Sequence, residues 1–105
     1  MIDKVSLKRA SSRIGTAEAE GAKLLLDGRD VVVPGFEEGN FLGPCIIDHA
    51  NPGMACYDKE ILAPVMIIVR VDTLDQAIEL INKNSFGAGC AIFTKSGGNA
   101  RKFQN

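Results

Sequence analysis

The sequence predicts an α/β fold, made of a short hairpin and a βαβ unit with flanking helices. Two observations carry this prediction. The continuous apolar run Val65–Val69 is typical of a strand buried on both faces. A well-marked helix follows it, and then a second apolar segment, Gly89–Thr94. Strand, helix and strand in this order predict a βαβ unit over about residues 65–94.

The first third of the chain predicts a helix and then a hairpin. Apolar side chains recur near one helical face over about residues 5–19, and Gly21 suits the end of that helix. The residues on this face are Val5, Ala10, Ile14 and Ala17. Two apolar runs, Leu24–Leu26 and Val31–Val33, then flank a turn sequence that begins with Asp27-Gly28. This pattern predicts a hairpin over about residues 24–33.

The middle of the chain predicts one irregular strand, Phe41–Ile47, which contains Gly43-Pro44. Proline has no amide hydrogen for a strand ladder, so we expect this strand at an edge of the sheet or with a bulge. Residues 48–53 are expected to form a loop.

The helix after Val69 has the strongest local signals in the chain. Thr73 suits the N-cap position, and Gln76 three residues later completes a capping-box pattern. One face of this helix is apolar, and it comprises Leu74, Ala77, Ile78 and Ile81. A further helix is expected to begin near Asn99.

Size and composition exclude several classes of function. With 105 residues and a net charge of −1, the chain is one domain at most and shows no electrostatic preference for nucleic acid or an anionic membrane. Its longest apolar run, Val65–Val69, is too short to cross a bilayer. The N-terminus lacks the apolar core of a secretory signal. Its basic residues suit either a transit peptide or the start of a helix.

The three cysteines, Cys45, Cys56 and Cys90, are an odd number without paired metal-ligand spacing. The single histidine, His49, lies near Cys45 in sequence, but two such residues fall short of the four ligands of a structural zinc site. We therefore expect three reduced thiols in a reducing compartment, at least two of them half-buried, and no metal. No sequence feature places a base beside any thiol, so no catalytic residue is assigned. At Cys90 we expect a packing role in the last strand.

Glu60 is the candidate binding residue. It precedes the apolar run at Val65 on a loop that contains Pro64. A carboxylate there can accept two hydrogen bonds from a vicinal diol such as that of a nucleotide ribose. The alternative from the residues alone is a solvated charge beside Lys59.

Several phrases of the sequence resemble the aldehyde dehydrogenase family, in the C-terminal part of its catalytic domain. The two most specific are Glu60-Ile61-x-x-Pro64-Val65 and Asn84-Ser85-Phe86-Gly87-Ala88-Gly89. The phrase Asn51-Pro52-Gly53-Met54-Ala55-Cys56-Tyr57 is similar to the CoA-acylating methylmalonate-semialdehyde dehydrogenase branch. The resemblance extends over about residues 11–103.

The resemblance implies roles for two positions. The glutamate that matches Glu60 binds the nicotinamide-side ribose of NAD, and the position of Leu62 lies near the nicotinamide. Two residues depart from the family pattern: Leu62 replaces an aromatic residue and Ala63 replaces a glycine. Leucine offers no aromatic face for stacking, and alanine is unfavourable wherever the backbone requires positive φ.

The resemblance also implies a reaction, the NAD-dependent oxidation of methylmalonate or malonate semialdehyde with transfer of the acyl group to CoA, as in valine and pyrimidine catabolism. The family's NAD-binding domain and nucleophilic cysteine motif have no counterpart in residues 1–105. We therefore expect a single partial catalytic domain, inactive alone, whose partners are the rest of the dehydrogenase or further copies of the chain. The expected compartment is mitochondrial for a eukaryotic enzyme and cytoplasmic for a bacterial one.

A second hypothesis from a different class stays open, namely a stand-alone α/β module that binds a partner or a nucleotide without catalysis. The thin cover that a small sheet would receive favours the first hypothesis, and it predicts exposed apolar strand faces and self-association.

Overall fold

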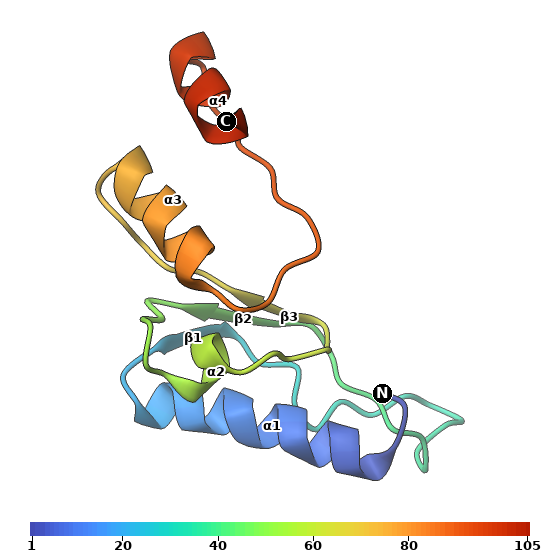
Figure 1. Ribbon diagram of the computed structural model, residues 1–105. Coiled ribbons are helices and arrows are strands. Elements are labelled where there is room, and N and C mark those ends of the chain that lie inside the picture. Colours follow the sequence, from blue (N-terminus) through green and yellow to red (C-terminus); the bar gives the residue numbers. More distant parts are fainter. The chain divides into compact units, whose positions relative to one another are not determined.

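A computed structural model describes residues 1–105, which form two compact units, Met1–Arg70 and Val71–Asn105. Four helices and one three-stranded sheet confirm the predicted α/β class (Figure 1). The longest helix has 16 residues, and none is long and apolar enough to cross a membrane.

The first unit begins with helix α1, Lys4–Ala19, which matches the predicted helix apart from one earlier residue. Asp3 caps it, because its Oδ1 accepts a hydrogen bond from the backbone amide of Ser6 at 2.7 Å. Gly21 follows the helix with φ 103°, a conformation that glycine adopts without strain. The buried residues of α1 lie at helical spacing and form one face: Ala10, Ile14 and Ala17.

The sheet contains β1 (Lys23–Leu26), β2 (Cys45–Asp48) and β3 (Val65–Ile67) in that spatial order. Strand β1 pairs antiparallel with β2, and β2 pairs parallel with β3. The predicted hairpin over residues 24–33 is therefore wrong, because Val31–Val33 is not a strand and β1 takes a distant partner. Asp30, in the turn after β1, has a left-handed backbone, with φ 61°.

The strand predicted over Phe41–Ile47 is shorter and placed differently. It begins after Pro44, at Cys45, and forms the centre of the sheet instead of an edge. Because proline lies outside the strand, every residue of β2 keeps its amide hydrogen for the ladders on both sides.

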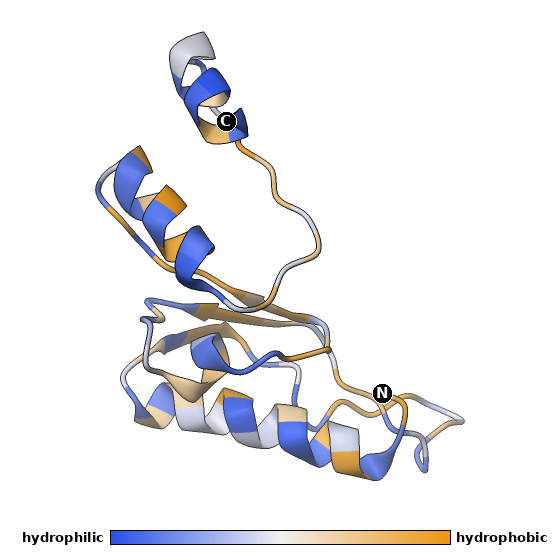
Figure 2. Ribbon diagram, in the orientation of Figure 1, coloured by the Kyte–Doolittle hydropathy of each residue, from blue (hydrophilic) through white to orange (hydrophobic).

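Helix α2, Ala55–Asp58, lies in the connection between the two parallel strands. It packs on α1, and both helices lie on one side of the sheet (Figure 1). The core between them is a cluster of buried residues: Ile14, Ala17, Ala22, Cys45, Ile47, Ala50 and Cys56. Figure 2 shows hydrophobic residues concentrated in β2 and β3, whereas most of α1 is hydrophilic or intermediate.

The predicted exposure of apolar strand faces is confirmed. Leu25 and Leu26 of β1 and Met66 of β3 are exposed, Met66 by 60%. The expectation that Val65–Val69 is buried on both faces is wrong, since Met66 faces outward and only alternate residues pack against the core.

Residues 29–42 form a loop without regular secondary structure, closed at its base by two glycines. The amide of Gly43 donates to the carbonyl of Gly28 at 2.8 Å. A Cβ atom added to Gly28 would lie 2.2 Å from the carbonyl carbon of Gly43, so the close approach requires glycine there. The N-terminal amino group donates to the carbonyl of Asn40 at 2.8 Å and so joins the loop to the start of the chain.

The second unit contains α3, Leu74–Lys83, and α4, Gly97–Gln104. The capping box predicted at Thr73 and Gln76 is confirmed in both directions. Lys102 of α4 forms an ion pair with Asp75 of α3 at 2.6 Å. The predicted strand Gly89–Thr94 is wrong, and with it the βαβ unit over residues 65–94, because this segment has no regular secondary structure. An apolar run becomes a strand only where a neighbouring edge can pair with it.

Candidate functional site

The candidate site is the loop Lys59–Pro64, which connects α2 to β3 and has no regular secondary structure. Both residues predicted for cofactor binding lie on it. Glu60 is exposed, and Leu62 is 81% exposed. Ile61, between them, packs against the core of the first unit. The loop therefore alternates an outward carboxylate, an inward apolar side chain and an outward apolar side chain.

The backbone of this loop is held at both ends. A guanidinium nitrogen of Arg13, on α1, donates to the carbonyl oxygen of Glu60. The amide of Cys45, on β2, donates to the carbonyl of Pro64 at 2.9 Å. With Ile61 in the core, these contacts fix the loop while leaving the carboxylate of Glu60 in solvent.

This arrangement suits a ligand with neighbouring hydroxyl groups. The Glu60 carboxylate forms no ion pair within the chain, so both oxygens are available as acceptors. Leu62 adds an exposed apolar surface two residues away. Ala63 does not have positive φ, so alanine in place of glycine introduces no backbone strain at this position. The residues present thus fit a nucleotide ribose.

The three thiols occupy different environments. Cys45 and Cys56 are each 1% exposed, in agreement with the expected burial, and burial is the main cause that raises the pKa of Cys56. The amide of Gly28 donates to the Cys45 sulfur at 3.2 Å. Cys90 is exposed and lies outside any strand, so the predicted packing role is wrong. A buried thiol with a raised pKa is a poor nucleophile, because the thiolate is the reactive form.

An ion pair at the other end of the strands, between a buried carboxylate and an exposed guanidinium, was not predicted from the sequence. Asp48, the last residue of β2, is 3% exposed and binds Arg70, which follows β3. The side-chain hydrogen bonds from Arg70 are the main cause that lowers the pKa of Asp48 to about 2. The only sequence signal was an aspartate directly after the apolar residues 45–47, and it did not identify the partner.

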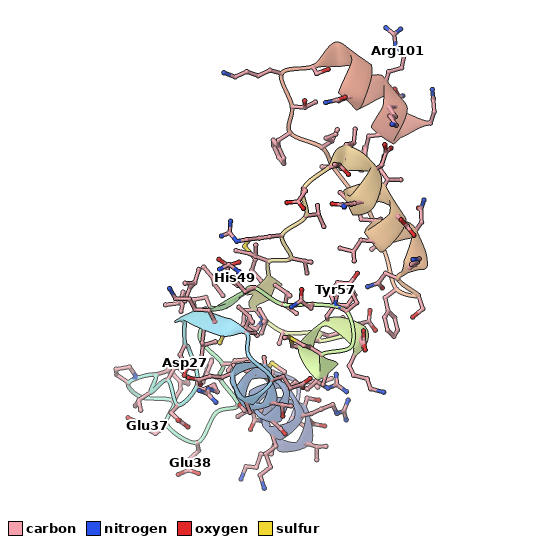
Figure 3. All side chains as sticks on the ribbon, turned by 90° about the vertical axis from the view of Figure 1, so that its left-hand side faces the viewer. Asp27, Glu37, Glu38, His49, Tyr57 and Arg101 are labelled. Carbon is pink, nitrogen blue, oxygen red and sulfur yellow. The ribbon has the colours of Figure 1, made fainter.

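The single histidine follows this aspartate. His49 has φ 56°, is exposed, and lies just beyond the end of β2 (Figure 3). Its Nε2 lies 3.9 Å from Oδ2 of Asp48, and its amide donates to Oδ1 at 2.7 Å. No group of three or more His, Cys, Asp or Glu side chains gathers anywhere in the chain in a way that could hold a metal ion.

Comparisons with known proteins agree on one family. The sequence profile described as the aldehyde dehydrogenase family matches residues 1–105. The chain is 51% identical over 104 residues to the mitochondrial acylating methylmalonate-semialdehyde dehydrogenase of Arabidopsis thaliana, covering 99% of this chain and 17% of that protein. It is 45% identical over 103 residues to the methylmalonate-semialdehyde/malonate-semialdehyde dehydrogenase of Homo sapiens, covering 98% of this chain and 19% of that protein.

Solved structures show the same relationship. The crystal structure of methylmalonate-semialdehyde dehydrogenase from Oceanimonas doudoroffii matches with a TM-score of 0.93 and 39% identity, over 99% of this chain and 21% of that one. A betaine aldehyde dehydrogenase from Staphylococcus aureus, in complex with NAD+, matches with a TM-score of 0.87 and 26% identity, over 99% and 21%. The chain thus spans about a fifth of the length of the proteins it matches.

Proposed function

The chain belongs to the aldehyde dehydrogenase family, and from this premise we propose that it is part of an NAD-dependent, CoA-acylating methylmalonate/malonate-semialdehyde dehydrogenase. The observation that carries the proposal is the identity of 45–51% to methylmalonate-semialdehyde dehydrogenases over nearly the whole chain. Identity to other aldehyde dehydrogenases of solved structure is 23–26%. The chain is therefore far more similar to this branch than to those relatives.

In this proposal the chain contributes to the binding of NAD. When bound, NAD accepts hydride from the substrate. Glu60 would hold a ribose through its exposed carboxylate, with Leu62 offering apolar surface beside it. The support is that the loop backbone is held by Arg13 and Cys45 while the carboxylate stays unpaired.

We also propose that residues 1–105 alone do not catalyse the oxidation. Two of the three thiols are buried, and the pKa of Cys56 is raised. The third thiol, Cys90, is exposed, and no hydrogen bond or ion pair to a base or a cation is found for it within its own compact unit. A covalent aldehyde mechanism requires a thiolate activated by a base or a cation.

The compartment and partners follow from the same branch. Eukaryotic relatives are mitochondrial proteins, so we propose a mitochondrial location if the source is eukaryotic and a cytoplasmic one if it is bacterial. The partners would be the remainder of the dehydrogenase or further copies of the chain, which would cover exposed residues such as Leu25 and Met66.

The test is an NMR titration of the 15N-labelled chain with NAD at millimolar concentration. We expect shifts concentrated at residues 59–63, and we expect Glu60→Gln to weaken binding about tenfold or more, since hydrogen bonds to a charged acceptor are strong. Glu38→Gln, at another exposed glutamate, is the matched control. Equal affinities for wild type and Glu60→Gln would contradict the ribose role.

A parallel assay tests catalysis. The chain is mixed with NAD, CoA and malonate semialdehyde, and NADH is followed by absorbance. We expect no NADH above the rate without protein. NADH formation that disappears on Cys90→Ser would contradict the proposed inactivity.

A further inference from the structure

Arg13 lies on α1 at the border of the buried face. The neighbouring residues on that face, Ala10 and Ile14, are buried, and Arg13 itself is half-buried. Its aliphatic stem can therefore lie along the apolar surface while the guanidinium reaches outward. The guanidinium donates to the carbonyl of Glu60, 47 residues later in the chain.

The segment that Arg13 holds has little rigidity of its own. Helix α2 has only four residues, and its N-cap residue, Met54, makes no side-chain capping hydrogen bond. The following residues, 59–64, belong to no helix or strand, and backbone hydrogen bonds to α2 and β2 hold only the two ends of this segment, at Lys59 and Pro64. The hydrogen bond from Arg13 therefore ties this loop to α1, a regular helix of 16 residues, and restricts the movement of the loop backbone.

The hydrogen bond from Arg13 is made to the backbone carbonyl of Glu60, next to the Cα atom that carries the Glu60 side chain. The carbonyl of Glu60 fixes the peptide plane between Glu60 and Ile61, and Ile61 is itself fixed in the core. These two contacts fix the position of the Glu60 Cα and limit the directions that its Cα–Cβ bond can take. A carboxylate that must meet two hydroxyl groups at once depends strongly on that direction, because hydrogen bonds weaken steeply when misaligned.

We propose that Arg13 is a positioning residue for NAD binding: by holding the Glu60 carbonyl, it aims the Glu60 carboxylate at the ribose hydroxyl groups. This inference rests on the ribose role proposed for Glu60. Arg13 acts through Glu60 and touches no cofactor atom in this account.

The experiment compares three variants of the full chain. Arg13→Met keeps much of the aliphatic stem and removes every donor. Arg13→Lys keeps the charge and one donor group with a different reach. Lys8→Met removes one positive charge from an exposed position of the same helix and is the matched control. The measurements are {1H}-15N heteronuclear NOE values at residues 59–62, NAD affinity by chemical-shift titration, and the urea midpoint.

We expect Arg13→Met to lower the NOE values at residues 59–62 and to raise the Kd for NAD about three- to tenfold, the range of one hydrogen bond. Arg13→Lys should lie between wild type and Arg13→Met, and Lys8→Met should match wild type. A fall in the urea midpoint with unchanged NAD affinity would show a merely structural contact and overturn the inference.

Two further outcomes separate this inference from the function on which it rests. If Glu60→Gln weakens NAD binding and Arg13→Met does not, the positioning role fails while the ribose role stands. If the wild-type chain shows no response to NAD, the ribose role of Glu60 is overturned, and the positioning role of Arg13 is overturned with it. Arg13→Lys could also restore the wild-type affinity for NAD while the NOE values at residues 59–62 stay as low as in Arg13→Met. That result would indicate that the positive charge attracts NAD directly, and it would also overturn the positioning role.

Discussion

Arg70 holds Asp48 with two hydrogen bonds, from Nε to Oδ1 at 3.1 Å and from a terminal guanidinium nitrogen to Oδ2 at 2.6 Å. The pair joins the end of β2 to the chain just after β3. The backbone pairing of β2 with β3 also continues beyond the end of β3, since the amide of Ile68 donates to the carbonyl of Ile47 at 2.8 Å. The ion pair adds a side-chain contact at this end of the two strands. A buried carboxylate with a bidentate partner fixes the relative position of the two parallel strands.

This pair predicts a loss of stability in acid. The pKa of Asp48 is about 2 in the folded chain, against an ordinary value of 3.8. Its contribution to stability is therefore fully present above pH 3.8 and is lost as the pH falls through about 2. Asp27, bound by Arg29, also has a pKa of about 2 and contributes in the same window.

The variant Arg70→Met tests the cause of this shift. Without the guanidinium, the pKa of Asp48 should move upward toward 3.8, as followed by 13C NMR of the side-chain carboxyl groups. Asp27 is an internal control, because its partner Arg29 is unchanged and its pKa should stay at about 2. An unchanged titration of Asp48 would show that Arg70 is not the main cause.

Ile47 is fully buried at the centre of the sheet and core. Ile47→Ala should lower the free energy of unfolding by about 2–5 kcal/mol, and Ile47→Val by about 0.5–1.5 kcal/mol, measured by urea denaturation. Val32→Ala is the control, since Val32 is 70% exposed and its truncation should change stability by no more than about 0.5 kcal/mol. Similar losses for Ile47→Ala and Val32→Ala would mean that this core does not form in solution.

The close approach of Gly28 and Gly43 predicts a strong effect of one added methyl group. Gly28→Ala places a Cβ 2.2 Å from a backbone carbon, so the backbone must shift, at about 1–3 kcal/mol or more. Gly87→Ala is the control, because nothing lies within 4 Å of the added Cβ and its φ is not in the left-handed range. Thermal unfolding should show a lower Tm for the first variant and an unchanged or slightly higher Tm for the second.

The thiols should differ sharply in reactivity. Cys90 is exposed, whereas Cys45 and Cys56 are buried and the pKa of Cys56 is raised. A disulfide reagent at pH 8 should modify one thiol rapidly in the native chain and all three in urea. Cys90→Ser should remove the rapid phase. Rapid modification of a second thiol in the native chain would show that the core opens readily.

The elements that could be predicted from the sequence are those with local signals. Helix α1 follows from apolar spacing, and α3 from Thr73 and Gln76, which lie within one turn of each other. Capping and helical periodicity involve neighbours three or four residues apart, so a short window of sequence contains all the interacting groups.

The strand pairing could not be predicted in the same way. The sequence pattern predicts a nearby partner for β1 at Val31–Val33, but β1 pairs with β2 about 20 residues away, with Leu24 opposite Ile47. Gly89–Thr94 has the composition of a strand and has no regular secondary structure. Strand formation depends on which edge is available, and no local pattern contains that information.

In the candidate site too, local residues could be predicted from the sequence and long-range contacts could not. Glu60 and Leu62 could be identified from a contiguous phrase of sequence, and the structure places both on one exposed loop. The contact of Arg13 with Glu60 and that of Arg70 with Asp48 join residues 47 and 22 positions apart. These two contacts depend on how the helix and the strands pack. The charged residues can be read from the sequence, but which group each of them binds cannot.

The loop of residues 29–42 suggests where foreign sequence could be introduced. Because Gly28 and Gly43 close its base by a backbone hydrogen bond, the sheet does not depend on the length of what lies between them. Glu37 and Glu38 are exposed on this loop (Figure 3). Doubling the length of a flexible loop adds only about 0.6 kcal/mol of closure entropy. An epitope tag or a fluorescent-label sequence inserted between these two glutamates would interrupt the turn that the Gly39 amide and the Phe36 carbonyl close, and we expect the sheet to tolerate it.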